Sequence, residues 1–132
     1  EVDHFSIFGE WWMYPGPAGE VNASVAYTRV TLPNGNLVPY HPEFEGRLNY
    51  SYAFPKFTLR LGGKFHANSY ADVANAVRLD PVIDLSFGGT YSFTPAFQVT
   101  LDLENLLNRE NQRWLNYKNP GLSLLAGLRY RW

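Results

Sequence analysis

Apolar and polar residues alternate along most of this chain of 132 residues. A period of two indicates β-strands, whereas an amphipathic helix repeats every 3.6 residues. In segment 97–104 the apolar residues lie on one face, and Gln98, Thr100, Asp102 and Glu104 lie on the other. The same alternation predicts about seven strands, at residues 5–14, 21–28, 47–54, 57–66, 83–93, 97–104 and 122–132. The predicted fold class is therefore all-β, although Phe8 and Trp12 obscure which face of segment 5–14 is apolar.

The connections between the predicted strands are alternately short and long. Short turns rich in Pro and Gly alternate with long polar loops, in the order 15–19, 33–43, 55–56, 68–80, 94–96 and 105–120. An antiparallel up-and-down meander with tight turns at one end and long loops at the other is typical of bacterial outer-membrane barrels. Strands of about ten residues also fit a tilted crossing of the hydrocarbon layer. The chain, 1–132, is therefore predicted to be a single segment of a transmembrane β-barrel.

Charged residues in the middle of the polar faces indicate which face meets lipid. They suit a water-filled lumen crossed by ion pairs, and the candidates are Arg60, Lys64, Asp84, Asp102, Glu104, Arg129 and Arg131. We expect Arg129 and Arg131 to lie across the ladder from Asp102 and Glu104. Aromatic residues collect beside the short turns, at positions 11, 12, 14, 52, 54, 57, 91, 93, 97, 130 and 132. Such a girdle is expected at a membrane interface, so the apolar face is predicted to contact the lipid bilayer.

Composition removes several other classes of function. The formal charge is -1, with eleven basic and twelve acidic residues, so no basic surface is available for nucleic acid. Cysteine is absent, and His4, His41 and His66 lie in unrelated segments, so we expect no metal site and no cofactor. Asp102 and Glu104 are better suited to ion pairing than to acid–base catalysis. We therefore expect a protein that is not an enzyme.

The segment from Gln98 to Trp132 resembles the C-terminal end of TonB-dependent outer-membrane receptors. The resemblance rests on Leu103-Glu104-Asn105-Leu106-Leu107-Asn108, on Trp114 and Tyr117, on Asn119-Pro120-Gly121, and on the final Gly127-Leu128-Arg129-Tyr130-Arg131-Trp132. Leu107 and Trp132 depart from the commonest form, which has an aromatic residue and Phe at these positions. The resemblance covers about the last quarter of the chain, and the remainder has compatible patterning.

The resemblance implies a 22-stranded barrel with an N-terminal plug domain in the outer membrane of Gram-negative bacteria. Such receptors take up iron chelates, cobalamin or oligosaccharides, and they are energised by the TonB complex. It also implies that the barrel assembly machinery reads Tyr130 and Trp132 in the last strand. Simple anchoring of these two side chains at the interface is the alternative. Neither the plug nor the TonB-binding segment is present in these 132 residues.

An odd number of strands predicts that the chain forms only part of a barrel. Bacterial single-chain barrels have even strand numbers, and an open strand edge cannot lie in lipid. We therefore expect the remainder of the barrel to come from upstream sequence or from another chain. An eighth strand in 34–42 would complete a small barrel, but Pro33, Pro39 and Pro42 argue against it.

An external ligand is expected at the loop 105–119, with Arg109, Arg113, Trp114 and Tyr117 as the contact residues. The alternative is that this loop only packs on neighbouring loops. Two other functions remain open from the sequence. One is a small outer-membrane barrel that serves as an anchor or adhesion module, and the other is a soluble ligand-binding barrel of lipocalin type.

Overall fold

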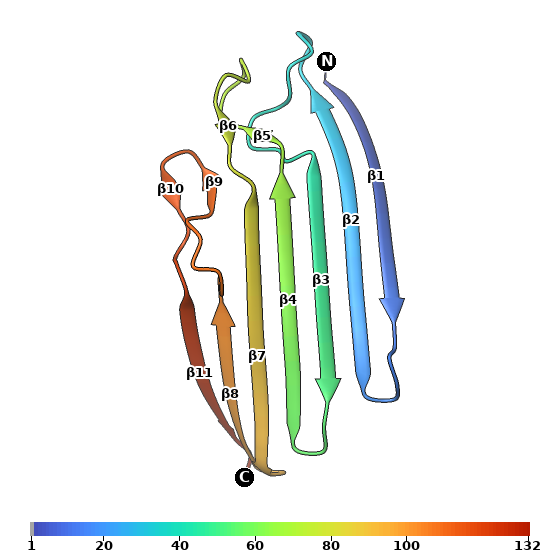
Figure 1. Cartoon of the computed structure of the whole chain (residues 1–132), viewed down its shortest axis with the longest axis vertical. Coiled ribbons are helices and arrows are strands. Elements are labelled where there is room, and N and C mark those ends of the chain that lie inside the picture. The colour runs from blue at the N-terminus through green and yellow to red at the C-terminus, as the bar shows by residue number, and fades with distance from the viewer. Residues whose placement is uncertain (1) are drawn as a thin grey trace.

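The computed structural model describes residues 2–132 and contains strands and loops, with no helix in that range. Seven long strands form one antiparallel sheet, in the order β1-β2-β3-β4-β7-β8-β11 (Figure 1). They are β1 Asp3–Met13, β2 Gly19–Thr31, β3 Phe44–Ala53, β4 Phe57–Ala67, β7 Val82–Thr94, β8 Phe97–Glu104 and β11 Ser123–Tyr130. The predicted all-β class and the seven antiparallel strands are confirmed.

Every long strand pairs with the next long strand along the chain, so the sheet is a simple meander. The short turns all lie at one end of the sheet, and the long loops lie at the other (Figure 1). Two of the long loops contain small hairpins, formed by β5 Ser69–Tyr70 with β6 Arg78–Leu79 and by β9 Gln112–Trp114 with β10 Tyr117–Lys118. These hairpins were not predicted, because strands of two or three residues are too short to show a period of two.

The register collects the apolar side chains on one face of the sheet. On β4, Leu61 lies opposite Tyr50 of β3 and Phe87 of β7, and this pattern continues along the sheet. Side chains in these apolar rows are partly or largely exposed, and Leu128 retains 76% of its accessible surface. The buried apolar residues of the described range are Leu37, Leu79 and Val82, beneath the long loops or at their base. Neither face of the sheet therefore has a packed hydrophobic core.

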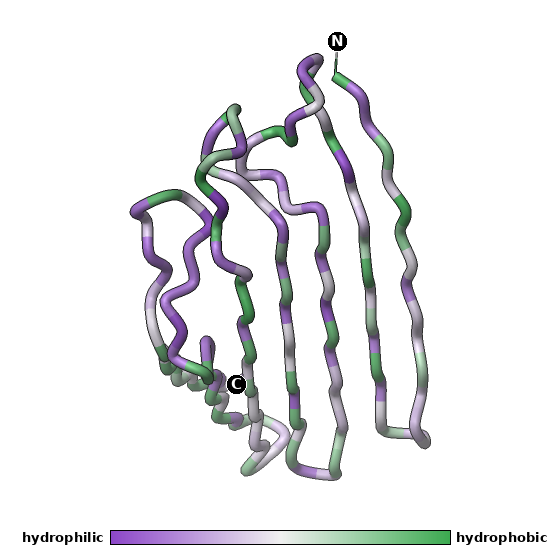
Figure 2. Tube along the Cα trace, turned by 45° about the horizontal axis from the view of Figure 1, so that its top comes forward, coloured by the Kyte–Doolittle hydropathy of each residue, from purple (hydrophilic) through white to green (hydrophobic). Residues whose placement is uncertain are grey.

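The sheet twists across its width and stays open. In Figure 2, β8 and β11 run in a different direction from β1 to β4, as expected from the right-handed twist of strands. Within residues 2–132, β1 and β11 pair with β2 and β8 only, so each leaves one edge without a partner. The described sheet is not closed, and closure into a barrel therefore stays a prediction. No helix in the described range is long and apolar enough to cross a membrane.

Candidate functional site

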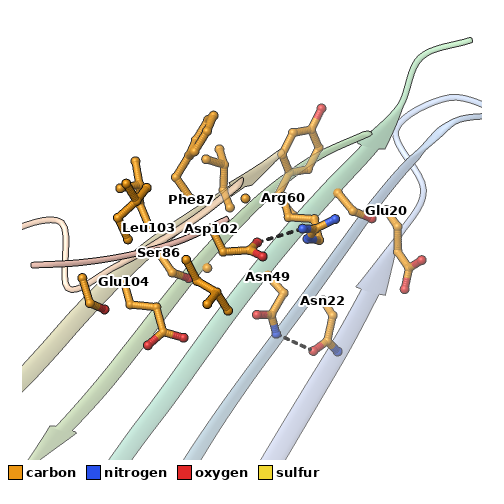
Figure 3. Close-up of a pocket in the computed structure, with 17 residues that line it drawn as sticks. Glu20, Asn22, Asn49, Arg60, Ser86, Phe87, Asp102, Leu103 and Glu104 are labelled. Carbon is orange, nitrogen blue, oxygen red and sulfur yellow. Dashed lines mark hydrogen bonds and ion pairs between the residues drawn. The ribbon is translucent and has the colours of Figure 1, made fainter. Parts of the chain in front are cut away.

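An ion pair crosses the middle of the polar face. Nη2 of Arg60 on β4 donates to Oδ1 of Asp102 on β8 at 2.8 Å (Figure 3). Nη1 of Arg60 donates to Oγ1 of Thr90 at 3.0 Å. Strand β7 runs between β4 and β8, and its Gly88 lies opposite both charged residues. A Cβ atom on Gly88 would lie 2.5 Å from Oδ1 of Asp102 and 3.0 Å from Nε of Arg60. Gly88 therefore leaves the space in which the ion pair crosses β7.

A trough of about 570 Å³ lies over the same face (Figure 3). Its floor continues from Arg60 and Asp102 to the amides of Asn22 and Asn49. Nδ2 of Asn49 is 3.5 Å from Oδ1 of Asn22, and Nδ2 of Asn22 donates to Oε1 of Glu10 at 3.1 Å. Because the trough lies on the polar side, the concave side of the sheet is its hydrophilic side.

The other charged candidates are distributed differently from the expectation. Lys64 lies opposite Asp84, but no ion pair joins them among the described residues. Instead, Oδ1 of Asp84 accepts the backbone N–H of Asn105 at 3.1 Å. The side chain of Asp84 therefore helps to fix the start of the last long loop on β7.

The expectation that Arg129 and Arg131 lie across the ladder from Asp102 and Glu104 is wrong. The register places Leu125 opposite Asp102, Ser123 opposite Glu104, and Gln98 opposite Arg129. The backbone N–H of Arg131, beyond the end of β11, donates to the carbonyl of Ala96 at 2.9 Å. The spacing of residues along the chain could not reveal this register. The register of β11 on β8 depends on the conformation of the loop that joins the two strands.

Asn105 closes that loop. Its Nδ2 donates to the carbonyls of Arg109 and Pro120 at 2.9 and 3.0 Å, and its Oδ1 accepts the N–H of Arg109 at 3.1 Å. Oδ1 of Asn108 accepts the N–H of Leu122 at 2.9 Å, just before β11 begins. Both asparagines have positive φ, of 52° and 48°, which Asn tolerates better than most residues. The paired Asn residues of the sequence motif therefore position the last strand.

Two further asparagines join loops by pairing with both polar groups of one backbone residue. Asn111 accepts the N–H of Ile83 at 3.2 Å and donates to its carbonyl at 3.0 Å. Asn75 accepts the N–H of Leu37 at 2.7 Å and donates to its carbonyl at 3.0 Å. Asn75 thus joins the loop after β2 to the loop after β4. The sequence gives no periodic signal for either contact.

Glu43, which was also not predicted, is buried at the loop end of the sheet. Its carboxylate accepts hydrogen bonds from Nδ2 of Asn68 and from the Tyr27 hydroxyl, the latter at 3.3 Å. Nε of Arg29 lies 3.8 Å from its Oε1. One carboxylate therefore holds the ends of β2, β3 and β4 together.

The four residues predicted to contact an external ligand lie in the last long loop. Trp114 is 57% exposed, and its ring lies 4.5 Å, centroid to centroid, from the ring of Tyr40 in the first long loop. Tyr117 and the two arginines, Arg109 and Arg113, are exposed as well. These side chains are accessible from outside the sheet, and Trp114 also packs on a neighbouring loop.

Aromatic side chains form two belts, one beside the short turns and one beside the long loops, on the apolar face and at the adjoining strand ends. The belt beside the short turns includes Tyr52 and Phe54, with ring centroids 4.6 Å apart, and Phe93 and Phe97, with centroids 5.5 Å apart. The belt beside the long loops contains the pairs Phe5–Tyr27 and Tyr27–Phe44, at 6.3 and 4.9 Å, respectively.

The residues at the ends of the sheet complete this distribution. Tyr130, at the end of β11, lies opposite Phe97 and is exposed, and so is Trp132. Trp12 lies opposite Asn22 and is therefore on the polar face, together with Phe8. Thus β1 also carries large apolar side chains on the polar face.

No group of three or more His, Cys, Asp or Glu residues within 2–132 could hold a metal ion. Comparison of the sequence with known protein families found no match, and comparison with curated proteins found none.

Proposed function

We propose that this chain forms part of the wall of an outer-membrane β-barrel. The observation that carries the proposal is the exposed apolar face, which has no charged residue between its two aromatic belts. On β4 this interval runs from Phe57 to Phe65, and eight residues span about 26 Å along a strand. At a strand tilt of about 35–45° this length rises about 18–21 Å across the membrane, somewhat less than the apolar band of about 25 Å in outer-membrane barrels.

The position of the trough favours a membrane barrel with a water-filled lumen over a soluble barrel of lipocalin type. In a soluble barrel the apolar side chains line the concave interior. Here the trough is lined by Arg60, Asp102, Asn22 and Asn49, with Leu125 beside them, and most of the apolar side chains point to the other face. A charged pair in water and an apolar surface in hydrocarbon are both favourable, whereas the reverse arrangement leaves both groups in costly surroundings.

The directions of the two edge strands support a larger barrel. Because each strand is antiparallel to the next, β1 and β11 both run from the long loops toward the short turns (Figure 1). The two edge strands run in the same direction, so they cannot pair antiparallel with each other. In two copies with the same membrane orientation, β1 of one copy and β11 of the other also run in the same direction and cannot pair antiparallel. Antiparallel closure therefore requires an odd number of further strands, supplied by the rest of the polypeptide or by another chain.

Within this class we propose a TonB-dependent receptor for energised uptake of a scarce nutrient, of the siderophore, cobalamin or oligosaccharide class. The support is the resemblance of the region from Gln98 to Trp132, in which Asn105, Asn108 and Pro120 form the loop that leads into β11. In this function the partners are the TonB complex and the barrel assembly machinery, which would pair with the exposed edge that carries Tyr130. A small anchor or adhesion barrel is the alternative.

Cell fractionation tests the membrane proposal. The complete protein is expected to sediment with bacterial outer membranes, to resist carbonate washing, and to migrate faster on electrophoresis before heating than after it. Recovery in the soluble fraction without detergent would contradict every membrane function. The polypeptide that precedes β1 then separates the two alternatives, because a plug-like domain supports the receptor, whereas a signal peptide alone supports the anchor.

A further inference from the structure

Two positive charges face each other on the polar side of the sheet, near the long loops. Arg47 on β3 and Lys64 on β4 are direct register partners, and both are exposed. Like charges directly opposite each other destabilise a strand pair. Four residues along β4 from Lys64, by contrast, Arg60 is neutralised by Asp102 at 2.8 Å. Lys64 also lies opposite Asp84 of β7, but no contact ion pair joins them, so among the described residues Arg60 has a contact ion pair and Arg47 and Lys64 have none.

The carboxylates on this part of the polar face have other partners. Oε1 of Glu10 accepts a hydrogen bond from Asn22, and Oδ1 of Asp84 accepts the backbone N–H of Asn105. Oε2 of Glu45 lies 3.9 Å from Nδ1 of His66. Among the described residues, neither Arg47 nor Lys64 has a carboxylate oxygen within 4.0 Å. Arg47 and Lys64 are therefore cations without a contact ion pair, on a face that also carries the carboxylates of Asp84 and Glu45.

A third cation approaches from the last long loop. Arg113 on β9 lies within electrostatic range of His66, and so do Arg47, Lys64 and the carboxylate of Glu45. Arg47 and Lys64 thus lie side by side at the loop end of the polar face, and Arg113 lies on the small hairpin of the last long loop. A groove of about 320 Å³ beside Arg47 is lined by Ser24 and Asn22, and also by the carboxylates Glu10 and Glu45.

We propose that Arg47, Lys64 and Arg113 form a binding site for a soluble solute that carries phosphate or carboxylate groups. An oxyanion between Arg47 and Lys64 would convert a repulsive pair into two attractive contacts, and Arg can bind two of its oxygens at once. A lipid headgroup is not the occupant, because lipids would meet the apolar face. The proposal rests on the proposed function in one respect, since it requires the polar face to be wet and open at the long loops.

Titration calorimetry with inorganic pyrophosphate tests the site. The complete protein in detergent is titrated at an ionic strength held constant with sodium chloride, and saturable binding is expected. Arg47→Gln and Lys64→Gln should each raise Kd by at least about fivefold, because each removes a charge-assisted contact. Arg129→Gln is the matched control, since Arg129 is also on the polar face without an ion pair among the described residues, and Kd should not change.

Thermal unfolding without pyrophosphate gives a second measurement. Arg47→Gln should unfold at the same temperature as the unmodified protein or at a higher one, because it removes the repulsion from Lys64. The site is overturned by an absence of saturable binding, by an equal loss in Arg129→Gln, or by a lower unfolding temperature of Arg47→Gln. If binding fails while the protein still sediments with outer membranes, only the anion site is withdrawn, and the barrel proposal stands.

Discussion

Replacing Gly88 with Ala tests whether the ion pair across β7 is packed as described. The new Cβ atom would lie 2.5 Å from Oδ1 of Asp102 and 3.0 Å from two nitrogen atoms of Arg60, so the pair must shift. Overpacking of this kind costs about 1–3 kcal/mol. Ala in place of Gly in a strand recovers about 0.5–1 kcal/mol of conformational entropy. The expected net loss in the free energy of unfolding is therefore between about 0 and 2.5 kcal/mol, with a middle value of about 1 kcal/mol.

A double-mutant cycle separates this clash from other effects of the substitution. In an Asp102→Ala background the nearest obstacle is gone and the Arg60 side chain is released from its ion pair and can move aside, so Gly88→Ala should be neutral or should stabilise by about 0.5–1 kcal/mol. Asp102→Ala alone should cost less than about 1 kcal/mol, because the side chains of Arg60 and Asp102 are 42% and 36% exposed.

Urea unfolding of the complete protein in lipid vesicles, followed by tryptophan fluorescence, provides the free energies for this cycle. Gly127→Ala is the control, because its Cβ atom would meet only Cβ of Thr100, at 3.9 Å, on the same polar face. Equal effects of Gly88→Ala and Gly127→Ala would refute the reasoning. So would a Gly88→Ala cost that persists without the Asp102 carboxylate.

Three further predictions concern lipid contact, loop closure and pH. Leu101→Arg should destabilise the membrane-inserted protein by about 2–4 kcal/mol, whereas Thr100→Arg on the opposite face should cost much less, as measured by urea unfolding in vesicles. Asn105→Ala should cost about 1–3 kcal/mol and speed protease cleavage within 105–122, since it removes the buried amide that binds the carbonyls of Arg109 and Pro120. The pKa of Asp72 is lowered, mainly because its carboxylate accepts a hydrogen bond from the backbone N–H of Val77. This hydrogen bond should therefore persist at pH values below the usual carboxyl pKa, and it should be lost as the pH falls through the lowered pKa of Asp72. NMR titration of the Val77 amide checks this, and a shift centred at the ordinary Asp value would contradict it.

The strands could be predicted because each has a strict period of two. Val99, Leu101 and Leu103 alternate with polar residues, and the structure pairs β8 as that alternation requires. The alternation of short turns with long loops likewise fixed the meander, since tight turns join only antiparallel neighbours. In β1, the large apolar residues Phe8 and Trp12 made it impossible to tell the polar face from the sequence. The structure shows it, because Phe8 pairs with Ala26 and Trp12 pairs with Asn22, both on the polar face of β2.

The contacts in the loops could not be predicted in this way. Asn75 reaches Leu37 across 38 residues, and Asn111 reaches Ile83 across 28 residues, so neither contact leaves a local pattern. The ion-pair partner of Arg60 was one of several carboxylates in the sequence, and the choice of Asp102 depends on the registers of β7 with β4 and β8. The pairing of strands that are distant in the sequence therefore determines which side chains meet on the polar face, whereas local periodicity identifies the strands of the sheet.

Site-directed spin labelling along β8 tests the central claim most directly. Single cysteines at positions 98 to 103 in the complete protein, reconstituted in lipid, would be labelled, and collisions with oxygen and with a water-soluble nickel chelate measured. Labels at Val99, Leu101 and Leu103 should be accessible to oxygen and shielded from nickel, whereas those at Gln98, Thr100 and Asp102 should be accessible to nickel. The opposite phase, or nickel access at every position, would contradict a lipid-facing apolar surface.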